Sequence, residues 1–235
     1  MPMILRMLAA AASWAATAQS AAAAEPVRQV AVHVEPFYSA ARKAGDAPVV
    51  RVGKTYDALL ASTRREDILA ARDKIVADPR VVTPMTLMVL AIRLYDMGLR
   101  DDAVFWFYAA KDRYGTLSEV AVAGTPLLAQ SNEAMRNFST LAGPVINGYA
   151  FCDAAKQKAA RVEALAWVEA NPYAVVFMNE LPARSADRAA ALAAAVRSAR
   201  ASAAKESAHL ADPKNREAFD ALRKYNEADA KFCWK

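Results

Sequence analysis

The chain of 235 residues contains only two histidines, two cysteines and seven glycines. His33 and His209 are the only imidazoles, and no serine or cysteine stands in a recognisable nucleophile motif, so a Ser–His or Cys–His catalytic arrangement has no support. There is no HExxH motif and no glycine-rich phosphate loop, which leaves metallopeptidase and nucleotide-binding functions without their minimal features. We therefore predict no cofactor and no metal site.

The excess of one charge sign over the other is also small. Thirty Lys and Arg stand against 25 Asp and Glu, which gives a net charge of +5 at pH 7, and no block of like charge stands out. An excess this mild over a chain of this length predicts no nucleic-acid partner. The hydrophobic fraction of 55% is ample for a folded core.

The first 24 residues have the pattern of a secretory signal peptide. A short basic start ends at Arg6, an apolar stretch begins at Met7, and Ala22 to Ala24 supply the small residues that signal peptidase requires. The alternative is an uncleaved anchor, but this run is rich in alanine and serine, whereas a spanning helix needs about 20 strongly apolar residues. We predict a periplasmic or secreted protein with no stable membrane span once residues 1–24 are removed.

The two cysteines, Cys152 and Cys233, make an even count. In an exported chain this count is best explained by one disulfide, which would tie the C-terminal tail to the middle of the domain. A metal pair or a reactive thiol is the competing interpretation, although two sulfurs without matched histidines do not make a zinc site.

Residues 25–54 differ in pattern from everything after them. Valines alternate with other residues at 30–34 and recur at 49–52, which predicts two short strands, and Pro36, Gly45 and Pro48 between them interrupt any helix. The segment is predicted to be an extended arm or a loose β-hairpin. Because a free two-stranded hairpin is marginally stable, it should either pack on the helices or stay mobile.

Residues 55–235 predict one all-α domain of about seven helices arranged as antiparallel hairpins. The expected helices begin at capping or proline residues and end at glycine or before proline. Six of them have clear bounds, at roughly 63–78, 83–98, 101–115, 143–170, 185–209 and 213–232. The apolar stretch 173–181 is too short to assign to helix or strand.

The most informative part of this domain is residues 84–114, which spell two amphipathic helices joined by a short turn at Gly98. Small side chains let the two helices approach, and leucine and phenylalanine fill the space between them. The positions that carry this spacing are Leu87, Leu90, Ala91, Leu94, Tyr95, Gly98, Ala103, Phe107 and Ala110. The pattern resembles one unit of the tetratricopeptide and Sel1-type repeats, over these residues only.

Three departures separate this hairpin from such repeats. Leu87 stands where they often place tryptophan, Gly115 stands where they usually place proline, and no second copy follows at the expected period of about 34 residues. An ordinary antiparallel hairpin inside an all-α domain is therefore the alternative interpretation.

The resemblance implies that the first helix of the hairpin lines a ligand-facing surface. Its outward positions there are Met85, Met88, Ile92, Tyr95 and Asp96. This mostly apolar set would suit a helix or peptide from a protein partner. The alternative is that C-terminal helices of the same chain fill the groove.

Phe105 and Trp106 are further candidate contacts, because they belong to a run of four aromatic residues. Successive helical residues differ by about 100°, so four in a row cannot all face one neighbour. Core packing is the alternative role.

These features favour an exported, non-catalytic helical protein that acts as a protein–protein interaction module. One alternative is an inhibitor or immunity-type protein that blocks a toxin or a hydrolase. Another is a carboxylate-dependent hydrolase, because a glycosidase needs only two acids at a suitable separation, with Asp96, Asp101 and Asp102 as candidates. Asp101 and Asp102 also have a structural role as acids in the first turn of a helix.

Overall fold

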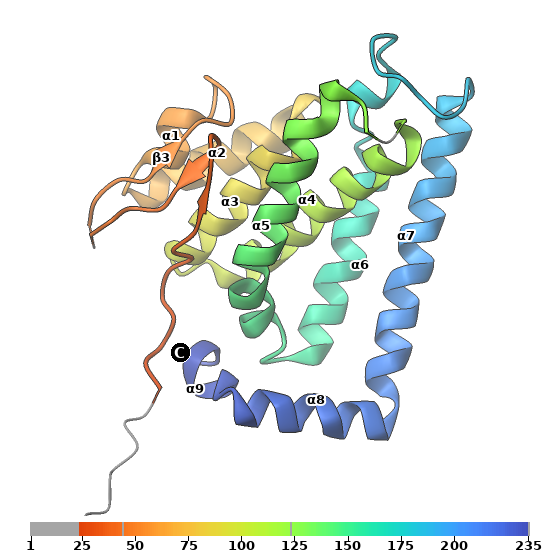
Figure 1. Ribbon diagram of the computed structural model, residues 1–235. Coiled ribbons are helices and arrows are strands. Elements are labelled where there is room, and N and C mark those ends of the chain that lie inside the picture. Colours follow the sequence, from red (N-terminus) through yellow and green to blue (C-terminus); the bar gives the residue numbers. More distant parts are fainter. Residues whose placement is uncertain (1–23, 44, 123, 235) are drawn as a thin grey trace, which may run out of the picture.

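The computed structural model describes residues 24–43, 45–122 and 124–234. The predicted signal peptide, apart from Ala24, lies outside these residues. Figure 1 shows a helical body with a small sheet against one side, so the predicted mainly α-helical class is confirmed.

The described residues contain nine α-helices, three short strands and two 3₁₀ segments, Pro79–Val81 and Ala174–Phe177. The strands are β1 (His33–Val34), β2 (Tyr38–Ser39) and β3 (Val49–Val50). The helices are α1 (Asp57–Ala61), α2 (Arg65–Ala77), α3 (Pro84–Asp96), α4 (Arg100–Val120), α5 (Pro126–Ala150), α6 (Ala154–Ala170), α7 (Arg188–Ala211), α8 (Pro213–Tyr225) and α9 (Ala228–Phe232). None of these helices combines the length and apolarity needed to cross a membrane.

Several predicted helix boundaries are confirmed by capping contacts. The Thr86 backbone N–H donates to Thr83 Oγ1 at 3.1 Å at the start of α3. Gly98 follows α3 with φ of +77°, a conformation that glycine adopts without strain. The helix expected from residue 63 begins slightly later, since α2 starts at Arg65 and its N-cap residue Arg64 makes no side-chain capping bond.

The predicted helix end at Gly115 and helix start at Gly143 are wrong. α4 runs through Gly115 to Val120, and α5 extends from Pro126 through Gly143-Pro144 to Ala150. Buried side chains recur along α5 at helical spacing, and this burial outweighs the local effect of glycine and proline. They are Leu128, Ala134, Met135, Phe138, Ala142, Ile146 and Ala150.

The predicted helix 213–232 is divided into α8 and α9. This division, the short helix α1 and the separate helix α5 raise the number of helices in the described residues above the expected seven. Glu227 has φ of +53° and separates α8 from α9. The stops before Pro172 and Pro213 are confirmed, and Asp187 and Asp212 cap α7 and α8 with their carboxylates.

The N-terminal arm, residues 25–54, packs on the helices. Its strands form one antiparallel sheet in the order β1-β2-β3, with Val34 opposite Tyr38 and Tyr38 opposite Val50. The arm contributes Tyr38 and five of its valines to the main core, namely Val30, Val32, Val34, Val50 and Val52. The described residues of the arm thus pack on the helices, the first of the two expected alternatives.

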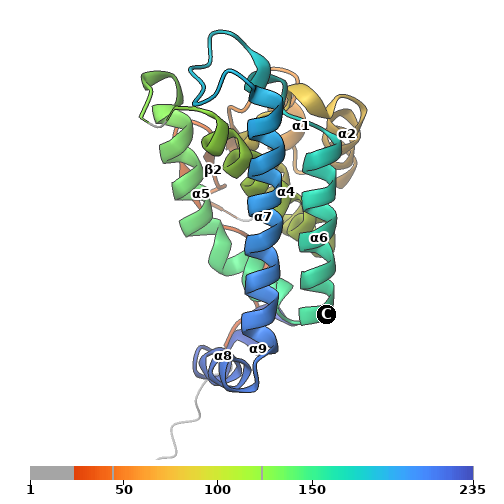
Figure 2. The ribbon, with the colours of Figure 1, turned by 90° about the vertical axis from the view of Figure 1, so that its right-hand side faces the viewer.

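α4 is the central helix of the body, in contact with α3, α5, α6 and α7. Figure 2 shows α7 lying across α4, with α5 and α6 to either side. From the C-terminal end of α7, α8 crosses the lower end of the molecule towards α9 and the chain terminus (Figure 1).

The predicted disulfide is confirmed, because Cys152 after α5 is bonded to Cys233 after α9.

Gly148 on α5 makes room for this tail, and its replacement tests the packing. A Cβ atom at Gly148 would lie 2.5 Å from the ring of Phe232. We expect Gly148→Ala to lower the free energy of unfolding by about 1–3 kcal/mol in urea denaturation, because the ring must move. The matched control is Gly115→Ala on α4, where a Cβ meets nothing within 4 Å and should stabilise the helix by about 0.5–1 kcal/mol. Equal effects of the two variants would contradict the packing of the tail.

Candidate functional site

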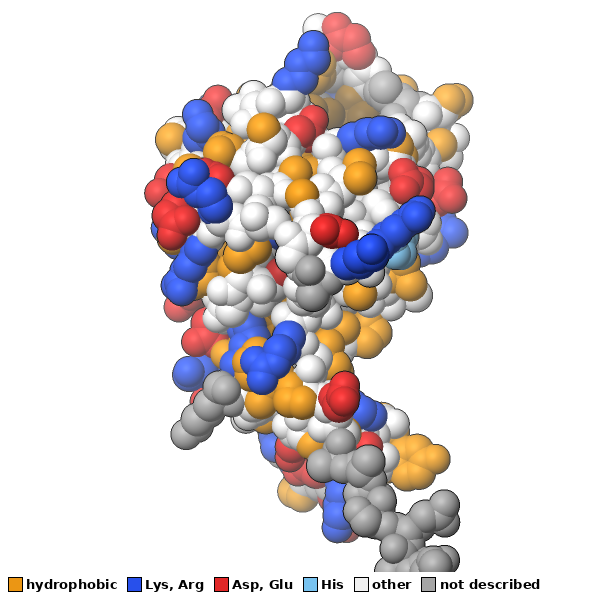
Figure 3. Space-filling model, turned by 90° about the vertical axis from the view of Figure 1, so that its left-hand side faces the viewer, with side chains coloured by type: hydrophobic (Ala, Val, Ile, Leu, Met, Phe, Trp, Pro, Cys, Tyr) orange, Lys and Arg blue, Asp and Glu red, His pale blue; other side chains and the backbone are white. Residues whose placement is uncertain are grey.

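The surface predicted on the first helix of the hairpin is not available to a partner. Met85 is 8% exposed, and Met88 and Ile92 are 0% exposed, because α3 is surrounded by α4, α5, α2, α1 and the N-terminal arm. The prediction is corrected on this point. As in the alternative interpretation, other parts of the same chain cover α3, but they are α5, α1, α2 and the N-terminal arm more than the last helices α7 to α9. On the face that Figure 3 shows, acidic and basic side chains are interspersed with small apolar areas.

Tyr95 and Asp96, two further candidates, hold the arm to α3. The Tyr95 hydroxyl donates to the Val27 carbonyl at 2.9 Å, and the Val30 N–H donates to Asp96 Oδ1 at 2.8 Å. Asp96 Oδ2 accepts from Arg93 Nη1 at 2.7 Å, with both side chains only 6% exposed. Burial raises the pKa of Asp96 to about 6, although the Val30 N–H and Arg93 oppose the shift. These contacts assign both residues a structural role.

Phe105 and Trp106 lie at an open cleft of about 660 Å³. Their rings meet edge to face at 5.0 Å, and the Trp106 ring meets Trp167 of α6 in the same way at 5.1 Å. Trp106 is 3% exposed and belongs to the core, while Phe105 is half-buried. We call this hollow the aromatic cleft. It lies between the first turns of α4 and α6, the end of α5 and the C-terminal tail.

The tail forms one wall of the aromatic cleft through Trp234. Two guanidinium groups lie over its ring, with Arg100 at 3.9 Å and Arg28 at 4.4 Å from the ring centroid. Arg100 also donates to the carbonyl oxygens of Phe232 at 3.2 Å and Trp234 at 2.7 Å, and lies 4.4 Å from the Tyr149 ring centroid. Arg100 therefore positions both the tail and the aromatic wall.

Charged groups of both signs form the rim of the cleft. Arg72 Nη1 donates to Asp102 Oδ2 at 3.1 Å, and the Tyr149 hydroxyl donates to Asp101 Oδ1 at 2.6 Å. Lys156 Nζ lies 3.7 Å from Asp101 Oδ2. Burial, followed by the Asp101 carboxylate, raises the pKa of Tyr149 to about 12, so its hydroxyl is a donor at neutral pH.

The side chains of the aromatic cleft are better suited to apolar contacts and hydrogen bonds with a ligand than to acid–base catalysis. Both candidate carboxylates, Asp101 and Asp102, are already engaged by a donor or cation of the same chain. In the described residues, no three His, Cys, Asp or Glu side chains group closely enough to hold a metal ion. The cleft is therefore a candidate site for a ligand with an apolar or aromatic group beside charged or hydrogen-bonding groups.

Of the residues at this cleft, the sequence predicts Phe105 and Trp106 as contacts and Asp101 and Asp102 as candidate carboxylates. Arg100, Tyr149 and Trp234 are not among the predicted residues. Two of them could have been predicted from the expected disulfide. A bond between Cys152 and Cys233 brings their sequence neighbours Tyr149 and Trp234 close together, and both line the cleft. Nothing local distinguishes Arg100 from other surface arginines.

The fold and the cleft define a mainly α-helical protein whose disulfide-linked tail closes one side of an aromatic cleft. An uncharacterized protein of Haemophilus influenzae is 36% identical over 231 residues, which cover 98% of this chain and 89% of that protein. The chain belongs to the same family as this Haemophilus protein. No family model matches the chain, and no solved structure matches it.

The buried Asp96 predicts a specific pH dependence of stability. Its pKa is about 6 in the folded protein and 3.8 ordinarily, so the folded state binds the proton more tightly. This contribution to stability is fully present below pH 3.8 and is lost as the pH rises through about 6. We expect acidification from pH 7 to 5 to favour the wild type over Asp96→Asn by about 1 kcal/mol in urea denaturation.

The control for this pH series is Glu66→Gln, which changes a carboxyl that is 74% exposed. It should follow the wild type at both pH values. A constant difference between the wild type and Asp96→Asn would show that Asp96 does not titrate in this range.

Proposed function

We propose that this protein is an exported, non-catalytic binding module that holds a short segment of a protein partner in the aromatic cleft. The observation that carries the proposal is the composition of the cleft. Aromatic side chains form its walls while Arg72, Asp101 and Lys156 stand on its rim. Tyrosine, tryptophan and arginine are the residue types most enriched at protein-binding hot spots.

Export is supported by the signal-like pattern of residues 1–24 and by the disulfide. Disulfides persist in the periplasm and outside the cell and are rare in the cytosol. In this proposal the mature protein begins near Glu25, which leads into the arm that contacts α3 and α9.

The size and chemistry of the cleft favour an extended peptide. Its volume of about 660 Å³ suits a few residues and lies in the usual range of ligand sites. An aromatic or long aliphatic side chain would pack on Phe105 and Tyr149. Charged neighbours on the peptide would pair with Lys156 or Asp102, whose side chains are 70% and 42% exposed.

The α3–α4 hairpin has a supporting role in this proposal. The resemblance to tetratricopeptide and Sel1-type units describes how the two helices pack, while the proposed ligand contacts come from the first turn of α4 and not from α3. The buried hairpin holds Phe105 and Trp106 in fixed positions. A site built on such rigid elements loses little conformational entropy when a ligand binds.

Intrinsic fluorescence offers a direct test. Of the four tryptophans, Trp106 and Trp234 line the cleft, Trp167 packs on Trp106, and Trp14 belongs to the predicted signal peptide. We expect peptides selected from a random library on the oxidised protein to change this fluorescence on binding. Phe105→Ala should weaken the binding by about tenfold or more, the size of effect expected from a buried aromatic contact.

Phe177→Ala is the matched control, since Phe177 is 41% exposed and does not line the cleft. Lys156→Glu is a second variant whose exposed position leaves folding intact, and it should alter which charged peptides bind. Equal affinities of Phe105→Ala and Phe177→Ala would overturn the proposal. Turnover of cell-wall or peptide substrates that is lost in Asp101→Asn would replace it with the hydrolase function.

A further inference from the structure

α8 stands off the helical body and is held mainly at its two ends. It contains no buried residue, and Leu222 and Tyr225 are 58% and 85% exposed. Its lateral contacts include the Phe219 ring against Phe151, with centroids 5.0 Å apart, and Arg223 donating to the Gly148 carbonyl at 3.2 Å. One end continues from α7 and the other leads through α9 to the disulfide (Figure 1). α8 is thus a strap closed covalently by Cys152 and Cys233.

The disulfide is accessible from the aromatic cleft. Both cysteines line it, with Cys152 exposed and Cys233 half-buried. Cys152 is therefore the sulfur that an external thiolate reaches more easily.

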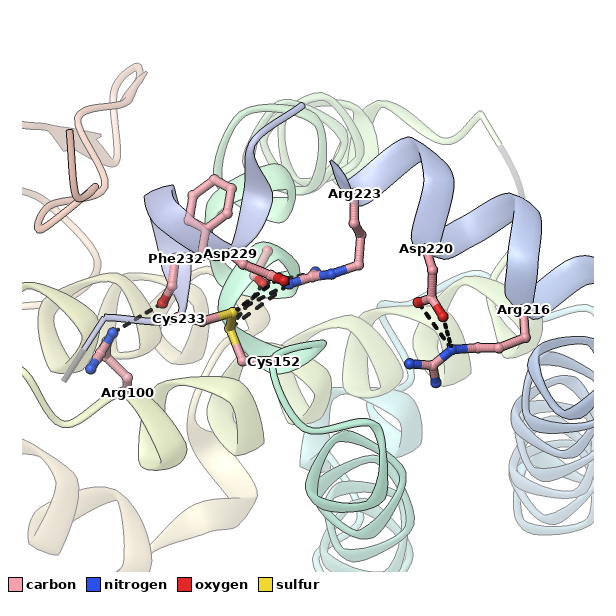
Figure 4. A network of polar contacts seen from close by, with 9 residues as sticks. Arg100, Cys152, Arg216, Asp220, Arg223, Asp229, Phe232 and Cys233 are labelled. Atoms are coloured by element: carbon pink, nitrogen blue, oxygen red, sulfur yellow. Dashed lines mark hydrogen bonds and ion pairs between the residues drawn. A yellow bond between two sulfur atoms is a disulfide. The ribbon is translucent and has the colours of Figure 1, made fainter. Parts of the chain in front are cut away.

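Arg223 places a positive charge beside the same bond. In Figure 4 its guanidinium extends from α8 to the disulfide, and Nη2 lies 3.3 Å from Cys233 Sγ and 3.9 Å from Cys152 Sγ. An adjacent arginine lowers the pKa of a thiol, and a thiol of lower pKa is the better leaving group in exchange. Asp229 opposes this effect, since its Oδ1 accepts from Arg223 at 2.7 Å and lies 3.5 Å from Cys233 Sγ.

From this geometry we infer that Cys152–Cys233 is a thiol–disulfide exchange site for a dithiol reductant. A thiolate of the reductant attacks Cys152 Sγ, the S–S bond breaks, and Cys233 leaves as a thiolate beside Arg223. The second thiolate of the reductant then attacks the mixed disulfide and releases Cys152. The reductant has lost two electrons and two protons and holds a new disulfide, while both cysteines of the protein end as thiols.

Reduction breaks the disulfide that joins Cys233, after α9, to Cys152 at the end of α5. Apart from the backbone that leads from α8, residues 226–234 are then held by non-covalent contacts, chiefly the Arg100 bonds to the tail carbonyls and Phe232 against Gly148. The core around α3 and α4 contains neither cysteine. The exchange therefore loosens α8, α9 and Trp234 and leaves the body folded. This inference concerns the disulfide itself and holds whatever ligand the cleft binds.

The chemical step is tested by the rate of reduction with dithiothreitol, followed by trapping of free thiols and mass measurement. We expect Arg223→Gln to slow reduction by about three- to tenfold, because the leaving thiolate loses its cation. Arg216→Gln is the matched control, since Arg216 lies on the same helix and pairs with Asp220 (Figure 4). It should leave the rate unchanged. Asp229→Asn should not slow the reaction, because it removes the opposing negative charge.

Arg223→Lys keeps the charge and should recover part of the lost rate, which separates an electrostatic role from a packing role. Equal rates for Arg223→Gln and Arg216→Gln would overturn the assignment of Arg223.

The opening of the strap after reduction is tested by limited proteolysis of the reduced and alkylated protein. Cleavage within residues 212–232 with the body intact is expected, and protection equal to that of the oxidised protein would overturn the opening of the strap.

Discussion

The architecture depends on the complete burial of α3. Every residue from Pro84 to Tyr95 is buried, because this helix carries apolar side chains around its whole circumference and not along one stripe. A single partner helix cannot cover such a surface, so α4, α5, α2, α1 and the N-terminal arm enclose it together. The repeat-like hairpin therefore forms the middle of the core, and the surfaces open to a ligand lie at its periphery.

Enclosing α3 takes backbone carbonyl groups out of water, and two buried arginines supply the missing donors. Arg93 donates to the carbonyls of Leu60 at 3.0 Å and Ser62 at 2.9 Å, where α1 ends. Arg113 donates to the Asn171 carbonyl at 2.9 Å after α6, and also to carbonyls around the 3₁₀ turn Pro79–Val81. Burial lowers the pKa of Arg113 to about 10, which still leaves it charged at neutral pH. Both cations hold chain segments that have little helix of their own.

The fold was largely predictable, because local signals and burial agreed along most of the chain. Thr83 with Pro84, Gly98 and the prolines after α2 and α6 mark helix ends whose chemistry needs no distant partner. Prediction failed at Gly115 and Pro144, where helix breakers are overridden by packing against other helices. Tertiary packing also explains why the candidate site was only partly predictable. Whether a helix face is exposed depends on the rest of the fold, so the pattern that made α3 resemble a binding surface could equally describe a core helix. The contact of Arg100 with the Trp234 ring joins residues far apart in sequence, which no local pattern indicates.

The burial of α3 and the position of the aromatic cleft at the periphery are linked. If the core excludes solvent from α3, any partner must bind elsewhere, and the aromatic cleft offers the contacts. Hydrogen–deuterium exchange of the oxidised protein at neutral pH tests this most directly. We expect amides of Leu87–Tyr95 to exchange only through global unfolding, while those of α8 exchange much faster. Exchange of α3 as rapid as that of α8 would mean that the N-terminal arm opens readily and presents α3 to partners, which would contradict the sealed burial of α3.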